Sequence, residues 1–199
     1  MVNRWFKNFT LFHLVLIAVI AALGVAVKPI VVPLAQLITG PFVPGGAAAG
    51  GIYMLFLVLA VSLTKMRGAG LLCGFCQALL VLALGVPGSH GAASLIIYTL
   101  PGLAVDLVFL PLLARRKKRE PNLIACMFAG LLANLTGTIA VGTVVFQLDV
   151  IFANVGAFFS IPAVPLLLML CMSALSGGVG GTAAWGITKQ LKKWGIVNA

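Results

Sequence analysis

The sequence predicts an all-α integral membrane protein with six transmembrane helices and both termini in the cytoplasm, forming one domain over residues 1–199. Three observations predict this fold class. The chain is 62% hydrophobic and only 8% charged, whereas soluble domains carry about 25% charged residues. Its apolar stretches approach the roughly 20 residues that a helix needs to cross a bilayer. All but one of its 13 Lys and Arg residues lie in alternate gaps between these stretches, as short cytoplasmic loops do.

The basic residues fix the expected orientation. They precede the first stretch, follow the second and fourth, and close the last: Arg4, Lys7, Lys65, Arg67, Arg115, Arg116, Lys117, Lys118, Arg119, Lys189, Lys192 and Lys193. The exception is Lys28, which follows the first stretch. A net charge of +10 would suggest nucleic acid in a soluble protein. Here the charge lies beside the predicted spans, so the expected partners of the basic residues are anionic lipid headgroups. We expect no nucleic-acid partner.

The six predicted spans cover approximately residues 8–27, 47–63, 69–84, 92–114, 122–146 and 162–187. Residues 28–46 separate the first two spans and contain four prolines, too many for a straight helix. Irregular backbone survives at membrane depth only under protein or beside a cavity. We therefore expect residues 28–46 to form a lid or re-entrant segment on the outer side.

The remaining connections follow from local turn signals. A basic turn at residues 65–68 separates the second and third spans, and a glycine-rich outer turn at residues 85–91 follows the third. The fourth span should bend or restart near Pro101. A basic loop precedes the fifth span, residues 147–160 form a second long outer segment, and a basic tail follows the sixth.

Polar side chains inside the spans are the candidate ligand contacts. Asp106 is the one acidic residue predicted within a span, where it needs a partner or a water-filled cavity. It is either a contact for an amine, amidine or aminopyrimidine or a structural residue, ionised or protonated, that forms a hydrogen bond to a neighbouring helix. Tyr98, two helical turns nearer the outer side, could stack on a flat heterocycle or anchor the helix at the interface.

Two buried amides and three outer residues complete the candidate set. Gln77 and Asn134 lie near the middle of their spans, where amides usually bond across helices, but polar groups on separate helices at similar depth could share a pocket. The outer candidates are Gln36, His90 and Asn154. We expect the pocket in the outer half of the bundle, because the outer connections hold most of the irregular polar sequence.

Two stripes of small residues predict close helix packing. Ala18, Ala22 and Ala26 form one in the first span, and Ser173, Gly177 and Gly181 form another in the sixth. Residues of this size at four-residue spacing let another helix approach closely. We interpret the sixth-span stripe as internal packing.

Four segments, at residues 42–46, 65–70, 84–88 and 98–109, resemble the substrate-binding S components of energy-coupling factor (ECF) transporters. The likeness covers roughly residues 40–112 and is greatest to the YkoE-type component, associated with thiamine or its hydroxymethylpyrimidine precursor. That family has Glu at the position of Asp106 and often an aromatic residue where Ser89 and His90 stand here. Nickel and cobalt S components, which begin Met-His, are less similar, since this chain has Val2.

The resemblance implies a function and partners. The protein would capture a vitamin from outside a prokaryotic plasma membrane and deliver it inward. A transmembrane T component and two ABC ATPases would supply the energy, so the chain itself would be no enzyme and need no cofactor or metal. The stripe of Ala18, Ala22 and Ala26 would face the T component.

Two other classes of protein remain as alternatives. A structural or assembly subunit of another membrane complex would also have stripes of small residues. An intramembrane enzyme would need a nucleophile–base pair or a metal cluster in a span, and the sequence shows scattered His residues and one intramembrane acid.

Overall fold

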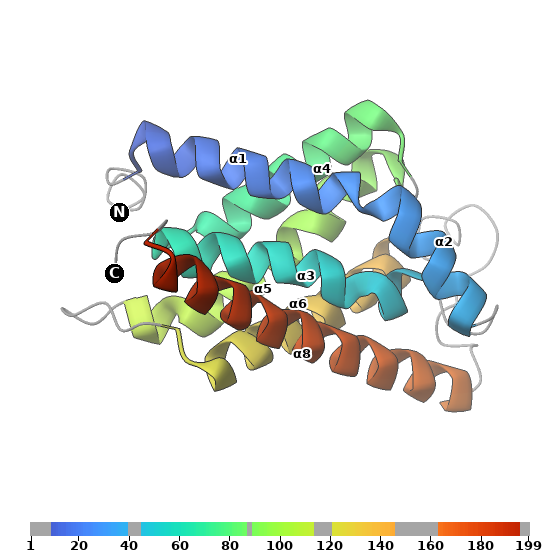
Figure 1. Cartoon of the computed structure of the whole chain (residues 1–199). Helices are drawn as coiled ribbons and strands as arrows, with labels where there is room; N and C mark the ends of the chain where they lie inside the picture. The colour runs from blue at the N-terminus through green and yellow to red at the C-terminus, as the bar shows by residue number, and fades with distance from the viewer. Residues whose placement is uncertain (1–8, 40–44, 87–88, 114–120, 146–162, 196–199) are drawn as a thin grey trace.

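The protein is a bundle of helices that run alternately in opposite directions (Figure 1). The computed structural model describes residues 9–39, 45–86, 89–113, 121–145 and 163–195. Its α-helices are α1 (Leu11–Ala26), α2 (Lys28–Thr39), α3 (Gly45–Thr64), α4 (Ala69–Leu84), α5 (Ser94–Leu113), α6 (Leu123–Ala140) and α8 (Ala163–Lys193). A 3-10 turn at Gly91–Ala93 precedes α5, and a π-helical turn at Val141–Val145 extends α6.

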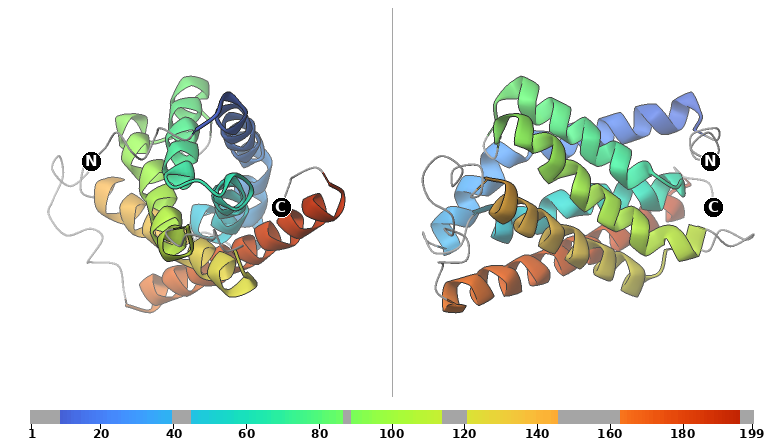
Figure 2. Two further views of the ribbon diagram at one scale, coloured as in Figure 1. Left: turned by 90° about the vertical axis from the view of Figure 1, so that its left-hand side faces the viewer. Right: turned by 180° about the vertical axis from the view of Figure 1, so that it is seen from behind.

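Helix α3 forms the centre of the bundle. It contacts α1, α2, α4, α5, α6 and α8, and 72% of its most apolar stretch is buried. The end-on view in Figure 2 shows α3 between the other helices. A helix that is apolar on all sides has no polar face to turn to water, so burial on every side is its expected place.

Four helices of the described chain are long and apolar enough to cross a membrane: Gly46–Thr64, Gly91–Leu113, Leu123–Thr143 and Leu167–Lys193. Helices α1 and α2 together pass the same test but are bent by 42°. Helix α4 has 16 residues and spans about 24 Å, less than the ~30 Å of hydrocarbon. The helices confirm an all-α membrane protein, whereas six spans and the orientation of the termini stay predictions.

The irregular backbone expected after residue 28 is absent up to Thr39, because α2 is a regular helix. The bend between α1 and α2 fits a broken span or a re-entrant segment, so the lid or re-entrant segment stays a prediction. Pro29 lies in its first turn, where a missing N–H removes no intrahelical hydrogen bond. Pro33, inside the helix, removes one. The chain therefore changes direction between Ala26 and Lys28 without losing helical structure. The rest of the predicted segment lies partly outside the described residues.

Several predicted helix ends are confirmed by local geometry. Gly85 ends α4 in the left-handed conformation, with φ of 59°, which glycine adopts easily. Asn122 caps the start of α6, and its Oδ1 accepts a hydrogen bond from the Ala125 N–H at 2.8 Å. The predicted restart near Pro101 is absent from α5, which is one continuous helix through Pro101.

The glycines of α8 pack inside the bundle, as the sequence predicted. A Cβ added to Gly177 would collide with the Gly130 carbonyl of α6, and one added to Gly181 would collide with the Cys126 carbonyl. Backbones at this separation exclude any side chain. This stripe therefore holds α6 against α8 and is closed to an outside partner.

Most described basic residues gather at one end of the bundle. The α3–α4 turn carries Lys65 and Arg67, and the last turn of α8 carries Lys192 and Lys193. Figure 1 shows this turn, the start of α1 and the end of α8 at the same end. Lys28 begins α2 away from this basic end and lies over Tyr53 near the middle of α3, so the exception in the sequence is also an exception in space.

Candidate functional site

A buried lysine between two tyrosine rings is the most unusual group in the described bundle. Lys28 is 1% exposed, and its Nζ lies 3.6 Å from the centre of the Tyr98 ring and 4.9 Å from that of Tyr53. We call Lys28, Tyr53 and Tyr98 the tyrosine cage. The change of direction before α2 brings Lys28 to α3, which carries Tyr53, and to α5, which carries Tyr98. Each contact is a cation–π interaction of about 0.5–2 kcal/mol.

Two unpaired polar atoms lie next to the tyrosine cage. The Tyr53 hydroxyl and the Gln77 Nε2 are buried, and neither has a hydrogen-bond partner among the described residues. Gly24, one turn before Lys28, packs against the Gln77 Nε2, since an added Cβ would lie 2.5 Å from it. Gly24 also contacts Phe56, one turn along α3 from Tyr53. Gln77 therefore lies at the junction of α1, α3 and α4, about one helical turn from Lys28 and Tyr53.

Asp106 has its partners at the basic end of the bundle. Its Oδ1 accepts a hydrogen bond from the Gly70 N–H at 3.1 Å, and its Oδ2 accepts one from the Leu71 N–H at 2.8 Å. These groups belong to the first turn of α4, where unpaired N–H groups need an acceptor. Gly68, at the N-cap position, has no side chain to supply one. Asp106 thus caps α4 from α5, and the helix dipole favours its negative charge there.

Asn134 connects three helices. Its Nδ2 donates to the Ser173 carbonyl at 2.8 Å, to the Ser176 hydroxyl at 2.9 Å and to the Ala47 carbonyl at 3.1 Å. The Ser176 hydroxyl in turn donates to the Ala47 carbonyl at 2.9 Å. These bonds join α3, α6 and α8, so the described contacts of Asn134 hold the bundle together.

The other predicted residues are dispersed. Gln36 is exposed on α2, and His90 is half-buried before α5, where its N–H donates to the Ser94 hydroxyl at 2.9 Å. Asn154 lies outside the described residues. Asp106 is eight residues, or about 12 Å, along α5 from Tyr98.

The structure therefore brings Tyr98 and Gln77 to the same region and places Asp106 and Asn134 elsewhere. Sequence reasoning missed Lys28 and Tyr53 as candidates. A signal for Lys28 was present, because it alone departs from the alternation of basic gaps. Nothing in the sequence distinguishes Tyr53 from an ordinary core tyrosine.

The alanine stripe on α1 faces away from the bundle. Ala18, Ala22 and Ala26 are all exposed, whereas Ile17, Ala21 and Val25, about 100° around α1, are buried. This exposure leaves the stripe accessible to a partner helix or lipid.

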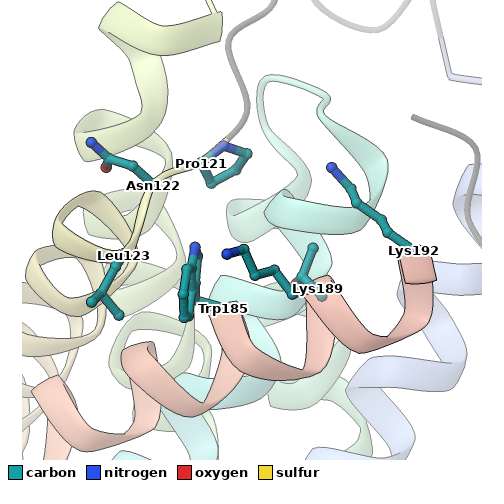
Figure 3. A pocket seen from close by; sticks show the side chains of 7 residues that line it. Pro121, Asn122, Leu123, Trp185, Lys189 and Lys192 are labelled. Atoms are coloured by element: carbon teal, nitrogen blue, oxygen red, sulfur yellow. The ribbon is translucent and has the colours of Figure 1, made fainter.

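Two of the hollows in the described bundle have volumes of about 300 Å³, and neither is lined by a predicted site residue. One lies between the start of α6 and the end of α8, where Figure 3 shows Lys189 beside Trp185, with Nζ 4.3 Å from the ring centre. The other, between α3 and α8, is almost wholly apolar; its lining is Ala48, Gly51, Ile52, Leu55, Ser176, Val179, Gly180 and Ala183. The first resembles a headgroup-facing surface, and the second offers little polarity for recognising a ligand.

Metal-ligating side chains are scattered through the described residues. No three His, Cys, Asp or Glu side chains gather there in a group that could hold an ion.

Two comparisons with known proteins found a match, one to a family and one to a fold. Residues 12–136 match the family model described as "ABC-type cobalt transport system, permease component". The fold is similar to a solved structure described as "Crystal structure of an S-component of ECF transporter", with a TM-score of 0.70 and 22% sequence identity over 95% of this chain and 88% of that one. No curated protein matches the chain.

Proposed function

Because the chain belongs to the family of ABC-type cobalt transport system permease components, we propose that it is the substrate-binding membrane subunit of an energy-coupling factor importer. The family match carries this proposal, since it assigns the chain to the membrane part of a transport system. The S-component fold over 95% of the chain supports it. In this role the subunit binds cargo and carries no chemistry, while a T component and two ATPases supply the energy.

We propose that the bent pair α1–α2 acts as one span and that α4 is a short span, which gives six crossings. Three features support both ends being cytoplasmic. The start of α1, the Lys65–Arg67 turn and the basic end of α8 lie at one end of the bundle (Figure 1). Short loops and span ends that carry basic residues usually lie on the cytoplasmic side. The tyrosine cage then lies toward the outer half, where cargo arrives.

The cargo that we propose is a vitamin or precursor with a flat heterocycle, of the thiamine or hydroxymethylpyrimidine type. Tyr98 and Tyr53 place two aromatic rings around the Lys28 ammonium, and the Gln77 Nε2 is unpaired among the described residues. Small-molecule sites commonly combine an apolar lining with a few polar groups in this way.

Cobalt is a second candidate cargo, favoured by the description of the family model. A cobalt ion would need nitrogen, oxygen or sulfur ligands from several side chains. The described residues bring no such group together, and they place the positive charge of Lys28 in the tyrosine cage. These two observations favour the organic cargo.

Native mass spectrometry of the purified protein tests the cargo. We expect a co-purifying small molecule with the mass of hydroxymethylpyrimidine or thiamine. Protein that instead retains Co²⁺ after desalting, with no organic mass, would replace the vitamin by the metal. Protein that retains neither, and binds neither when each is added, would favour the assembly-subunit alternative.

Association with the T component tests the importer role. Replacing Ala22 by Trp should abolish co-purification with the T component and ATPases, because a large ring on the alanine stripe prevents close approach of another helix. The matched control is Leu23→Trp, since Leu23 is 52% exposed at the same depth but about 100° around α1. Ligand binding should be unchanged in both variants. Normal recovery of the complex with Ala22→Trp would exclude this face as the interface.

A further inference from the structure

The Lys28 ammonium is buried without a negative partner in the described bundle. Among the described residues the only carboxylate is that of Asp106, and its two oxygens accept hydrogen bonds at the start of α4. The groups that face Nζ are the rings of Tyr53 and Tyr98. Rings attract a cation but accept no strong hydrogen bond, so they replace only part of the hydration that the ammonium lost.

The neighbouring unpaired atoms are also able to donate. The Gln77 Nε2 carries two N–H groups and the Tyr53 hydroxyl carries one O–H, and both atoms are buried without a partner among the described residues. Native interiors leave few polar atoms unpaired, and each exception calls for a cause. The Lys28 ammonium, which lies over the Tyr53 and Tyr98 rings, adds three further N–H groups to this set of donors.

A ligand that supplies acceptors would satisfy this set. Nitrogen atoms of a heterocycle, hydroxyl oxygens or carboxylate oxygens would accept from Lys28 and Gln77, while the flat part of the ligand packs on tyrosine. A positively charged ligand is disfavoured, because the ammonium already occupies the Tyr98 face at 3.6 Å and would repel it.

We propose that the tyrosine cage with Gln77 recognises an acceptor-rich part of the cargo that is uncharged or negative, and that Lys28 selects against cationic cargo. This inference rests on the proposed function and narrows it. Of the two pyrimidine candidates, it favours uncharged hydroxymethylpyrimidine over thiamine, whose thiazolium ring is positive, and it disfavours Co²⁺.

Titration calorimetry of the full-length protein with hydroxymethylpyrimidine, thiamine and Co²⁺ tests the inference. The wild type should bind hydroxymethylpyrimidine at least tenfold more tightly than thiamine. Lys28→Met keeps the length of the side chain and removes its charge and donors. It should weaken hydroxymethylpyrimidine binding at least tenfold while tightening thiamine binding.

The matched control is Lys189→Met. Lys189 also lies over an aromatic ring, with Nζ 4.3 Å from the centre of Trp185, but it is exposed at the opposite end of the bundle. Its replacement should change neither affinity. Opposite changes for the two pyrimidines separate charge recognition from general damage, which would weaken both.

Three results would overturn the inference. The first is a Lys28→Met protein that binds hydroxymethylpyrimidine as tightly as the wild type, which leaves the proposed function intact. The second is a wild type that prefers thiamine, a comparison that needs no variant and so holds even if Lys28→Met fails to fold. The third is a wild type that binds neither pyrimidine, which removes the proposed cargo as well.

Discussion

Two buried charged groups in this bundle have opposite surroundings. Asp106 is 8% exposed and accepts hydrogen bonds from two backbone N–H groups of α4. Lys28 is 1% exposed and lies against two tyrosine rings, with the Tyr53 hydroxyl and Gln77 Nε2 unpaired among the described residues nearby. The carboxylate thus caps a helix, whereas the ammonium caps no helix and pairs with no carboxylate among the described residues.

The difference shows how to separate structural from functional charges in a membrane bundle. Any charge inside a membrane is costly unless it has a partner. Where the partners are backbone groups of the same bundle, their hydrogen bonds to the charge offset that cost and stabilise the fold. A charge whose partner is missing is a candidate for binding a ligand, because the ligand can provide the partner.

Removing the carboxylate of Asp106 should have the larger effect. We expect Asp106→Ala to lower the free energy of unfolding by about 2–4 kcal/mol, because the Gly70 and Leu71 N–H groups would lose their acceptor in a buried place. Thermal and denaturant unfolding in one detergent measure this loss. Asp106→Asn, which keeps one acceptor oxygen, should lose less.

Binding measurements on the same variants test the sequence-based hypothesis that Asp106 contacts cargo. The capping contacts predict that folded Asp106→Asn binds cargo within about threefold of the wild type. A tenfold rise in Kd, about 1.4 kcal/mol, without loss of stability would instead establish Asp106 as a ligand contact.

Removing the charge of Lys28 should have the smaller effect on stability, with the opposite sign. In ligand-free protein, Lys28→Met should leave the unfolding midpoint unchanged or raise it. The variant no longer buries an ammonium that has no counterion among the described residues. The loss of the two cation–π contacts, about 0.5–2 kcal/mol each, limits the gain. The same unfolding assay measures both effects.

A stability loss for Lys28→Met as large as that for Asp106→Ala would remove the contrast between the two charges. It would give Lys28 a structural role like that of Asp106. Lys189→Met again serves as the control, since its ammonium is exposed.

Much of the helical layout could be predicted from local sequence. The end of α4 at Gly85 and the cap of α6 at Asn122 depend on residues within one turn. The packing of the α8 glycines was also predictable, because small residues at four-residue spacing let another helix approach closely. The prediction missed that α2 is helical, because it counted prolines. Whether a helix tolerates a proline depends on its position, and a proline in the first turn removes no hydrogen bond.

The sequence by itself determined that this is a helical membrane protein. Each residue has its own free energy of transfer into lipid, so the length of the apolar stretches and the placement of basic residues can be read without the tertiary structure. Only the tertiary structure decided which buried polar groups are paired. Asp106 accepts a hydrogen bond from Leu71, 35 residues away, and Lys28 of α2 contacts Tyr98 of α5, with α3 and α4 between them in sequence. Such pairings depend on how helices pack, a property of the whole bundle that no local pattern encodes.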